Sequence, residues 1–386
     1  MDTHKKLRIA VLSRNFVSTG GGAERYAIAL VEQLAEQHEV HVFAQTIQHN
    51  HPQVQYHLIG MPLRRPRWIN QLYFATATWW ATRQGFDIVH SHENTWHGNV
   101  QTVHVLPVKY NLFHNKHGMH RVLRWIKVAT SPRLLAYLAL EKMRFSLQKP
   151  RAIISVSKTL NEVMLQTYPE ATTGLKVIPP GIDAVPGRTS SAKKAAAREK
   201  LKLPLTERCI LFVGNDFRKK GLPTLVQTLP KLPDVVFLAV AGHSAQRPEM
   251  DQIIKSEGLE KRVLFLGAVS NINEAYQAAD FLVHPTLEDT YAMVVLEAMA
   301  HGLPVVVSNA AYCGIAAELE NGINAILLSN PKDVAELAAA CLNLLNHSDL
   351  SGKLSDAALA FANNSSWHQV RDIHIDVYSQ LTSAAV

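Results

Sequence analysis

The chain has 386 residues, which exceeds one ordinary hydrophobic core and predicts two domains. Hydrophobic residues make up 47% of it and charged residues 18%, the balance of a soluble globular protein, and its formal net charge is +7. The first apolar run, Ile9–Leu12, is too short for a signal peptide, and no stretch approaches the roughly 20 apolar residues that span a bilayer. The three cysteines are scattered along the chain. We therefore expect a reduced cytoplasmic protein.

Positive charge is concentrated in the first part of the chain. Residues 1–151 hold 19 Lys and Arg against 8 Asp and Glu, whereas residues 152–386 hold 20 against 24. Within the basic part, Lys109–Arg151 contains ten basic residues and Glu141 as its one acidic residue. Anionic lipid, phosphorylated glycan and nucleic acid are all candidate partners for such a surface.

Strand and helix patterns alternate through the first half, which predicts a doubly wound parallel sheet. Three glycines, Gly20–Gly22, separate the first strand from the first helix, so the backbone can approach a ligand there. Their spacing is not GxGxxG, so a dinucleotide site is poorly supported; a tight turn is the alternative. The predicted strands are Arg8–Ser13, Val40–Ala44, Val54–Ile59, Asp87–Ser91, Gln101–His104 and Ala152–Ser157.

Two basic stretches in this half suggest contact with a membrane surface. The segment Pro62–Gln84 has no acidic residue and combines Arg64, Arg65 and Arg67 with four Trp and Tyr residues, although its Trp79-Trp80 pair could equally be core. A helical pattern over Val122–Val128 places bases and aromatics on neighbouring turns, and a solvated helix is the alternative. Its basic residues are Arg121, Arg124 and Lys127.

A second α/β pattern follows the segment Lys176–Asp183, whose two prolines and glycine suit an exit from the first domain. The strand Cys209–Gly214 leads directly into Arg218, Lys219 and Lys220, three consecutive cations that can neutralise a diphosphate; a solvated basic turn is the alternative. Two buried strands, Val235–Gly242 and Val263–Val269, come next. An amphipathic helix begins at Ser366-Trp367 and completes the chain.

The stretch Phe281–Asn309 predicts a strand, a loop, a helix and another strand. Asp289 and Thr290 are suitable N-cap residues for the helix, and Glu297 lies eight residues after Asp289. At roughly 1.5 Å per residue the two carboxylates are about 12 Å apart, too far to share a proton or one metal ion. They can hold opposite ends of an elongated ligand, with a phosphate over the backbone N–H groups of Thr290, Tyr291, Ala292 and Met293.

This acid-x7-Glu spacing, followed by AMAHGLPVV, resembles the signature of retaining glycosyltransferases of family 4. The segments GNDFRKKG and PPGI resemble those of the lipopolysaccharide core glucosyltransferase subgroup. The resemblance implies the GT-B fold, two doubly wound Rossmann-like domains facing across a cleft. The acceptor-side domain would be residues 1–180, the nucleotide-sugar domain residues 181–365, and the helix at about residues 366–386 would cross back to the first domain.

The resemblance also implies roles for residues. Glu297 would hold the ribose, Asp289 would meet the sugar, and Lys219 and Lys220, with Arg218 possible, would stabilise the departing diphosphate. This chain departs from the family pattern where Thr290 and Ala292 replace the usual loop glycines. His104 would contact the donor sugar, Gly21 and Gly22 would face the sugar and diphosphate, and the base would lie near Gly242 and Val269.

The expected activity is therefore transfer of a hexose, with glucose from UDP-glucose as the first expectation, to a lipid-linked or lipopolysaccharide-core acceptor. We expect neither a metal ion nor a cofactor, no nucleic-acid partner, and a peripheral position on the inner face of the cell membrane. GDP-mannose and UDP-N-acetylhexosamine transferases of the same fold are alternatives, as are a GT-B epimerase or phosphorylase. A basic nucleic-acid-binding or membrane-binding protein without catalysis is an alternative of another class.

Overall fold

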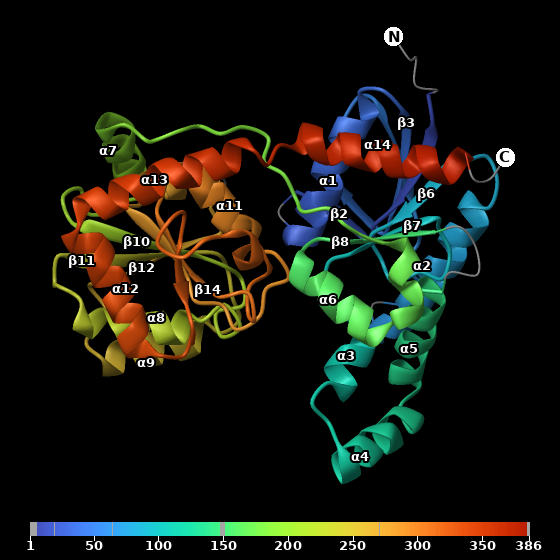
Figure 1. Cartoon of the computed structure of the whole chain (residues 1–386), viewed down its shortest axis with the longest axis horizontal. Helices are drawn as coiled ribbons and strands as arrows, with labels where there is room; N and C mark the ends of the chain where they lie inside the picture. Colours follow the sequence, from blue (N-terminus) through green and yellow to red (C-terminus); the bar gives the residue numbers. More distant parts are fainter. Residues whose placement is uncertain (1–5, 19, 64, 147–150, 270, 384–386) are drawn as a thin grey trace. The chain divides into compact units, whose positions relative to one another are not determined.

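The computed structural model describes residues 6–18, 20–63, 65–146, 151–269 and 271–383, and it divides the chain into two α/β units (Figure 1). One unit contains the chain up to Gly181 together with the segment from Trp367 onward, and the other runs from Ile182 to Ser366. Both are built on a parallel sheet with helices on its faces, which confirms the predicted pair of doubly wound domains.

The first unit contains a seven-stranded parallel sheet in the order β5-β3-β1-β6-β7-β8-β9. The chain builds outward from β1 on one side and then returns to β6 on the other, so the strand order reverses between β1 and β6. The strands are β1 (Arg8–Leu12), β3 (Glu39–Ala44), β5 (Val54–Leu58), β6 (Ile88–Ser91), β7 (Val100–Val103), β8 (Ala152–Ser155) and β9 (Leu175–Val177), beside a small parallel pair, β2 (Asn15–Val17) and β4 (Thr46–Gln48).

The helices of the first unit cover both faces of this sheet. The last of them, α14 (Trp367–Ser383), packs on α1 (Gly22–Ala35), where the rings of Tyr26 and Trp367 meet edge to face at 5.1 Å. The others are α2 (Arg67–Thr82), α3 (Val108–Phe113), α4 (Gly118–Ala129), α5 (Pro132–Arg144), α6 (Lys158–Thr167) and the short 3₁₀ helix at Pro169–Gly174. Among the described residues, no helix has both the length and the apolar composition needed to span a bilayer.

The second unit contains a six-stranded parallel sheet in the order β12-β11-β10-β13-β14-β15, with the reversal between β10 and β13. Its central strands are buried on both faces, which is why they are continuous apolar runs in the sequence. The strands are β10 (Arg208–Val213), β11 (Val236–Ala241), β12 (Val263–Gly267), β13 (Phe281–His284), β14 (Val305–Ser308) and β15 (Ile326–Leu328). The helices are α7 (Ser191–Lys200), α8 (Leu222–Thr228), α9 (Arg247–Ser256), α10 (Ile272–Ala278), α11 (Met293–Ala300), α12 (Val334–Asn346) and α13 (Ser348–Asn363), with 3₁₀ turns at Leu229–Lys231 and Gly314–Glu318.

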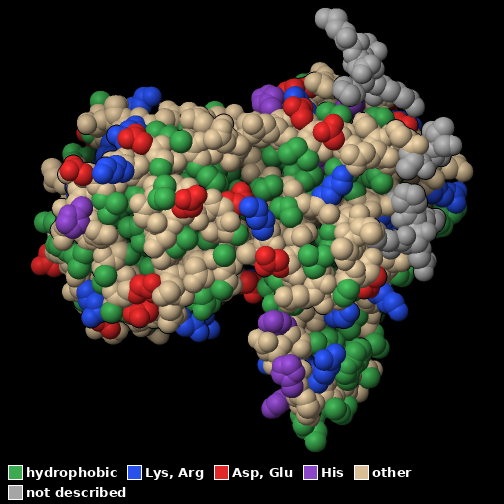
Figure 2. Space-filling view, viewed as in Figure 1, with side chains coloured by type: hydrophobic (Ala, Val, Ile, Leu, Met, Phe, Trp, Pro, Cys, Tyr) green, Lys and Arg blue, Asp and Glu red, His purple; other side chains and the backbone are tan. Residues whose placement is uncertain are grey.

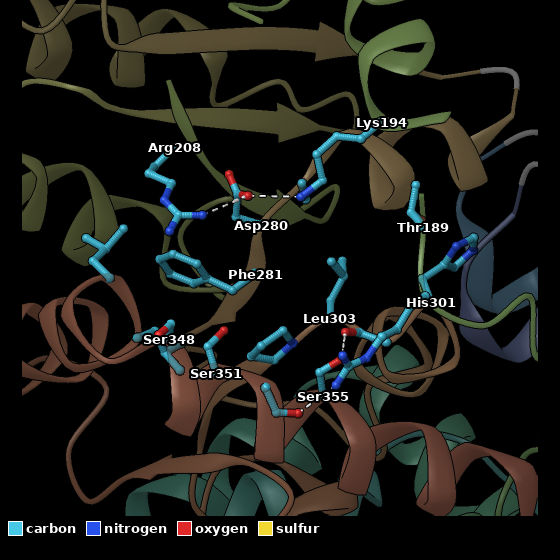
Figure 3. A pocket seen from close by; sticks show the side chains of 17 residues that line it. Thr189, Lys194, Arg208, Asp280, Phe281, His301, Leu303, Ser348, Ser351 and Ser355 are labelled. Atoms are coloured by element: carbon cyan, nitrogen blue, oxygen red, sulfur yellow. Dashed lines mark hydrogen bonds and ion pairs between the residues drawn. The ribbon is translucent and has the colours of Figure 1, made fainter. Parts of the chain in front are cut away.

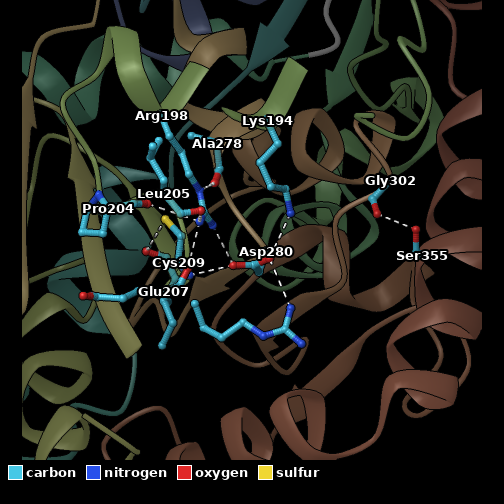
Figure 4. A network of polar contacts seen from close by, with 12 residues as sticks. Lys194, Arg198, Pro204, Leu205, Glu207, Cys209, Ala278, Asp280, Gly302 and Ser355 are labelled. Carbon is cyan, nitrogen blue, oxygen red and sulfur yellow. Dashed lines mark hydrogen bonds and ion pairs between the residues drawn. The ribbon is translucent and has the colours of Figure 1, made fainter. Parts of the chain in front are cut away.

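A nearly buried carboxylate holds α7 against the start of the central strands (Figure 4). Asp280 accepts hydrogen bonds from Lys194 at 2.9 Å, from Arg198 at 2.9 Å and from the backbone N–H of Cys209 at 2.7 Å. Burial raises the pKa of Asp280, but the charge of Lys194 and the Cys209 hydrogen bond outweigh it and hold that pKa below its usual value. The ionised carboxylate therefore stabilises the amino-terminal edge of the sheet, which is the edge opposite the loops that follow the strands.

Candidate active site

The two loops that leave the central strands of the second unit form one hydrogen-bonded structure. The carbonyl oxygen of Lys219, in the loop after β10, accepts from Leu287 N at 2.8 Å and from the Thr286 hydroxyl at 3.2 Å, both in the loop after β13. Gly221 has φ of +79°, and a Cβ there would lie 1.9 Å from the carbonyl oxygen of Pro285. Only glycine permits this close approach, so the basic loop and the acidic loop are held side by side.

An ion pair joins the same two loops. The Lys220 ammonium contacts Asp289 Oδ2, and the His284 Nε2–H donates to the same oxygen at 3.2 Å. Burial raises the pKa of Asp289, but the His284 hydrogen bond and the Lys220 charge outweigh it and hold that pKa far below its usual range. Asp289 is thus a partly buried carboxylate that is ionised at neutral pH, which suits it to charge stabilisation and hydroxyl orientation better than to proton donation.

The structure corrects the predicted start of the helix that carries Glu297. Asp289 and Thr290 do not cap it; α11 begins at Met293, and Ala292 is its N-cap in the left-handed region with φ of 78° and no side-chain cap. Asp289 is used instead in a backbone bridge to the segment after β14, since its N–H donates to Tyr312 O at 2.8 Å and its carbonyl accepts from Gly314 N at 2.9 Å. Because Asp289 lies outside the helix, helical spacing does not measure its distance from Glu297.

Glu297 lies within α11 and is held by a residue that sequence reasoning missed. The hydroxyl of Tyr276, in α10, donates to Glu297 Oε2 at 2.6 Å, and the ring of His301 stacks on the Tyr276 ring at 5.3 Å. Tyr276 is fully buried. This contact orients the carboxylate from the side of the core, and nothing in the local sequence around Tyr276 signals it.

The other two predicted cations have surface partners. Lys219 Nζ lies 2.6 Å from Glu288 Oε1, with both side chains more than two-fifths exposed. Arg218 Nη2 lies 2.6 Å from Glu249, and this hydrogen bond raises the pKa of the exposed guanidinium. Of the three consecutive cations, Lys220 is therefore the one drawn into the loop structure.

Gly242 and Val269 follow neighbouring strands of the sheet. Gly242 directly follows β11 with φ of 129°, and a Cβ there would lie 2.1 Å from the carbonyl oxygen of Gly214. Its N–H donates to Gly267 O at 2.8 Å, two residues before the half-buried Val269. Asn215 Oδ1 accepts from His243 N at 3.0 Å, so the ends of β10, β11 and β12 are tied together around a close backbone contact.

His104 lies at the carboxyl end of β7 in the first unit. It shares a hydrogen bond of 2.9 Å with His92, and its ring meets Tyr26 edge to face at 5.1 Å. Burial, together with the charge of Arg144, lowers the pKa of His104 to about 3, so the imidazole is neutral. Gly21 is the N-cap of α1 and Gly22 its first residue, so the glycine loop is also at the carboxyl edge of this sheet.

The predicted docking residues lie on exposed helix surfaces. Arg65 and Arg67 are exposed at the start of α2, and Arg64 lies outside the described residues. Trp79 and Trp80 are 41% and 62% exposed, so the core alternative for this pair is wrong. Basic and hydrophobic side chains share the surface around α4 (Figure 2). They are Arg121, Arg124 and Lys127 beside the exposed Met119, Val122, Leu123, Trp125 and Ile126.

A pocket of about 290 Å³ lies at the opposite, amino-terminal edge of the second sheet (Figure 3). Its cations are already paired, Lys194 and Arg208 with Asp280 and Arg188 with Asp356 at 2.7 Å. We therefore place the candidate site at the carboxyl edge, where Lys220, Asp289 and Glu297 lie. Within the described ranges, no three His, Cys, Asp or Glu side chains are grouped so as to hold a metal ion.

The two halves of the chain match two family models. Residues 20–185 match the model described as Glycosyltransferase Family 4, and residues 207–347 match Glycosyl transferases group 1. A D-inositol 3-phosphate glycosyltransferase of Xylanimonas cellulosilytica is 29% identical over 60% of this chain and 57% of its own length. The lipopolysaccharide glucosyltransferase WaaG of Escherichia coli K12 is 24% identical over 62% of this chain and 65% of its own length, so the chain spans less than two thirds of either relative.

Two solved structures resemble the whole chain. The crystal structure of WaaG, a glycosyltransferase involved in lipopolysaccharide biosynthesis, has a TM-score of 0.81 at 20% identity and covers 96% of this chain and 99% of its own. The structure of Anabaena HepE in complex with UDP and glucose has a TM-score of 0.77 at 19% identity, and the match covers 97% of this chain and 99% of the HepE chain. At these identities the likeness establishes the fold.

Replacing Lys220 by Met should destabilise the second unit, because it leaves the ionised Asp289 with His284 as its remaining side-chain partner. We expect a loss of about 2 kcal/mol in the free energy of unfolding at pH 7, less than breaking a fully buried pair costs. The stabilisation from the lowered Asp289 pKa is present above about pH 4 and is lost as the pH falls. Urea unfolding from pH 7 to pH 2 should show the difference shrink at the acidic end, where Asp289 of the variant takes up a proton first; a difference that stays constant to pH 2 would contradict the charge pairing.

Proposed function

We propose that the chain transfers a hexose from a nucleotide-diphosphate sugar to a lipid-linked or lipopolysaccharide-core acceptor, with retention of anomeric configuration. The chain has the GT-B fold and belongs to the glycosyltransferases, with a family 4 domain followed by a group 1 domain. The observation that carries the proposal is the meeting of Lys220 and Asp289 on hydrogen-bonded loops, followed by the oriented Glu297 on the next helix. A cation for a leaving diphosphate and two separate carboxylates for ribose and sugar are what this reaction requires.

The proposed donor is UDP-glucose. Support comes from HepE, which has the same fold and whose crystals contain UDP and glucose, and from the lipopolysaccharide glucosyltransferase among the relatives. The D-inositol 3-phosphate glycosyltransferase relative favours a second candidate, in which the acceptor is a phosphorylated polyol. GDP-mannose and UDP-N-acetylhexosamine stay in the donor panel, because the base and hexose are selected by pocket shape rather than by the charged residues.

In the proposed mechanism Glu297 accepts hydrogen bonds from the ribose hydroxyls, while the Tyr276 hydroxyl holds the carboxylate by donating to its Oε2. Lys220 stabilises the negative charge that develops on the diphosphate as the glycosidic bond breaks, so this step needs no metal ion. Asp289, ionised in the folded protein, orients the sugar hydroxyls and faces the positive charge that develops at the anomeric carbon. The acceptor hydroxyl attacks the anomeric carbon from the face that the diphosphate leaves and passes its proton to an oxygen of the departing diphosphate.

The remaining site residues have supporting parts in this proposal. His104, neutral because it is buried, donates or accepts a hydrogen bond at the transferred sugar and does not act as an acid. Gly21 and Gly22 present backbone N–H groups, while Gly242 and Val269 shape the site for the base. Arg218 and Lys219 supply surrounding positive charge from the exposed part of the basic loop.

The proposal is tested by measuring thermal shifts with a panel of nucleotide sugars, followed by acceptor trials with the sugar that stabilises the protein most. Transfer to a phosphorylated lipopolysaccharide core, with the anomeric configuration of the product read by NMR, is the expected result. Stabilisation by none of the nucleotide sugars, together with tight and salt-sensitive RNA or DNA binding, would favour the non-catalytic alternative.

Tyr276→Phe should raise KM for the donor about tenfold and leave kcat nearly unchanged, because Glu297 keeps its charge and loses the hydrogen bond that orients it. Glu297→Gln is the matched variant, and the double variant completes a cycle. We expect the two changes to be non-additive in KM. An unaltered KM in Tyr276→Phe would remove this orienting role from the tyrosine.

We further propose that the chain is peripheral on the inner face of the cell membrane and docks through α4. An amphipathic helix with exposed Trp125, Ile126 and Val122 beside basic residues can lie in the interface of an anionic bilayer. The helix α2, which packs on α5 as α4 does, adds the exposed Trp79 and Trp80.

Charge reversal at Arg121 and Arg124 should weaken binding to phosphatidylglycerol vesicles by about thirtyfold or more, since each basic residue near such a surface contributes about 1 kcal/mol. Co-sedimentation at low and high salt measures this. Lys255→Glu with Lys261→Glu, two exposed positions of the second unit, is the matched control and should bind like the wild type. Equal losses in both variants would show a general charge effect and reject docking through α4.

A further inference from the structure

A cavity of about 850 Å³ lies within the first unit, at the amino-terminal edge of its sheet. Phe86 precedes β6, Asn99 precedes β7 and Arg151 precedes β8, and all three line the cavity. His104 follows β7 at its other end. The cavity and the candidate active-site histidine therefore lie at opposite edges of the same sheet, and the proposed reaction makes no use of the cavity.

The helices α2 and α5, which pack against each other, form the sides of this cavity. Trp79 comes from α2, Met143 from α5, and Trp96 from the segment between β6 and β7. Trp79 and Met143 are 41% and 51% exposed, so apolar surface continues from the cavity to the outside of the unit. An occupant with an apolar part fits walls of this kind.

The charge of the cavity is positive and incompletely paired. Arg83, Lys142 and Arg151 line it, and none of its described lining residues is acidic. Arg151 has a structural role, because its guanidinium donates to Met143 O at 2.8 Å and Trp96 O at 3.1 Å and so closes the end of α5.

The other two cations differ from Arg151. Arg83 lies over the Trp80 ring at 3.6 Å, and in the part of the chain that the structure describes Lys142 has no hydrogen-bond or ion-pair partner. An anion would supply the charge that these two side chains lack.

A second observation points to a polar ligand. His97 lines the cavity, and both of its ring nitrogens are buried without a hydrogen-bond partner among the described residues. An imidazole always carries at least one N–H donor, and leaving a buried donor unpaired costs free energy. An acceptor oxygen brought by a ligand would meet this need.

We propose that this cavity binds a single anionic phospholipid, with its phosphate between Arg83 and Lys142 and its first acyl carbons along Trp79 and Met143. The lipid, rather than a free phosphate, is the occupant that also accounts for the exposed apolar rim. The proposal rests on the membrane docking in the proposed function and deepens it: α4 would hold the bilayer surface, and the cavity would select one lipid from it.

The test uses the full chain and dihexanoyl phosphatidylglycerol kept below its micelle concentration, so that no bilayer surface is present. Isothermal titration should give one site per chain, with weaker binding of dihexanoyl phosphatidylcholine and of glycerol phosphate. Arg83→Ala with Lys142→Ala should lower the affinity by about tenfold or more. The matched control is Arg133→Ala with Lys158→Ala, two exposed basic residues outside the cavity lining, and should leave the affinity unchanged.

The competing explanations give different results. Equal loss in the control pair, or no binding by the wild type, overturns the proposal. Equal affinity for glycerol phosphate identifies a free-phosphate site, and equal affinity for phosphatidylcholine an uncharged groove; each overturns it as well. Trp79→Ala should weaken the lipid but not glycerol phosphate. The assay contains no sugar and no vesicle. A failure to bind the lipid would therefore leave sugar transfer and docking through α4 untouched, and a failure of either of those would leave the lipid-binding result untouched.

Discussion

The site depends on how two loops at the carboxyl edge of one sheet are locked to each other. Lys219 offers its carbonyl oxygen to two groups of the loop after β13, and Gly221 allows the backbones to approach to a distance that any Cβ would prevent. The adjacent Lys220 is thereby delivered to Asp289. Without these backbone contacts Lys220 would be a surface cation without a fixed position. With them, its charge has a fixed position before a ligand binds. Less reorganisation of the protein is then needed for the lysine to stabilise a negative charge on the ligand.

The strands could be predicted because parallel strands buried on both faces are continuous apolar runs, as in Cys209–Gly214 and Phe281–His284. The candidate site residues Lys220, Asp289 and Glu297 lie in the loops after such strands or on the following helix, where the sequence predicted them. The first and last residues of the elements were less certain. The helix α2 was not predicted, because Trp and Arg residues in one segment are also typical of an exposed interface, and its N-cap is Pro66, which has no capping side chain.

Contacts between distant segments could not be predicted. Tyr276, in α10, precedes Glu297 by 21 positions and contacts it through the tertiary fold, and the His284 hydrogen bond to Asp289 closes the loop after β13. The prediction that Asp289 caps the helix of Glu297 was wrong for the same reason, because it took no account of contacts with distant segments. Locally, Asp289 is a good N-cap, but its backbone pairs with the segment around Tyr312 and its carboxylate with Lys220, so tertiary contacts take over the groups that a cap would use.

Charge pairing distinguishes the two cavities described at the amino-terminal edges of the sheets. At the amino edge of the second sheet, Lys194, Arg208 and Arg188 each meet a carboxylate, and the pocket is electrically complete without an occupant. At the amino edge of the first sheet, Lys142 faces a cavity that no described acid lines. A cluster of cations raises the free energy of the folded chain through mutual repulsion unless an anion offsets it. Residues 1–151 carry a net charge of +11 and the rest of the chain −4, so in our proposal the anion for that cavity comes from outside the chain.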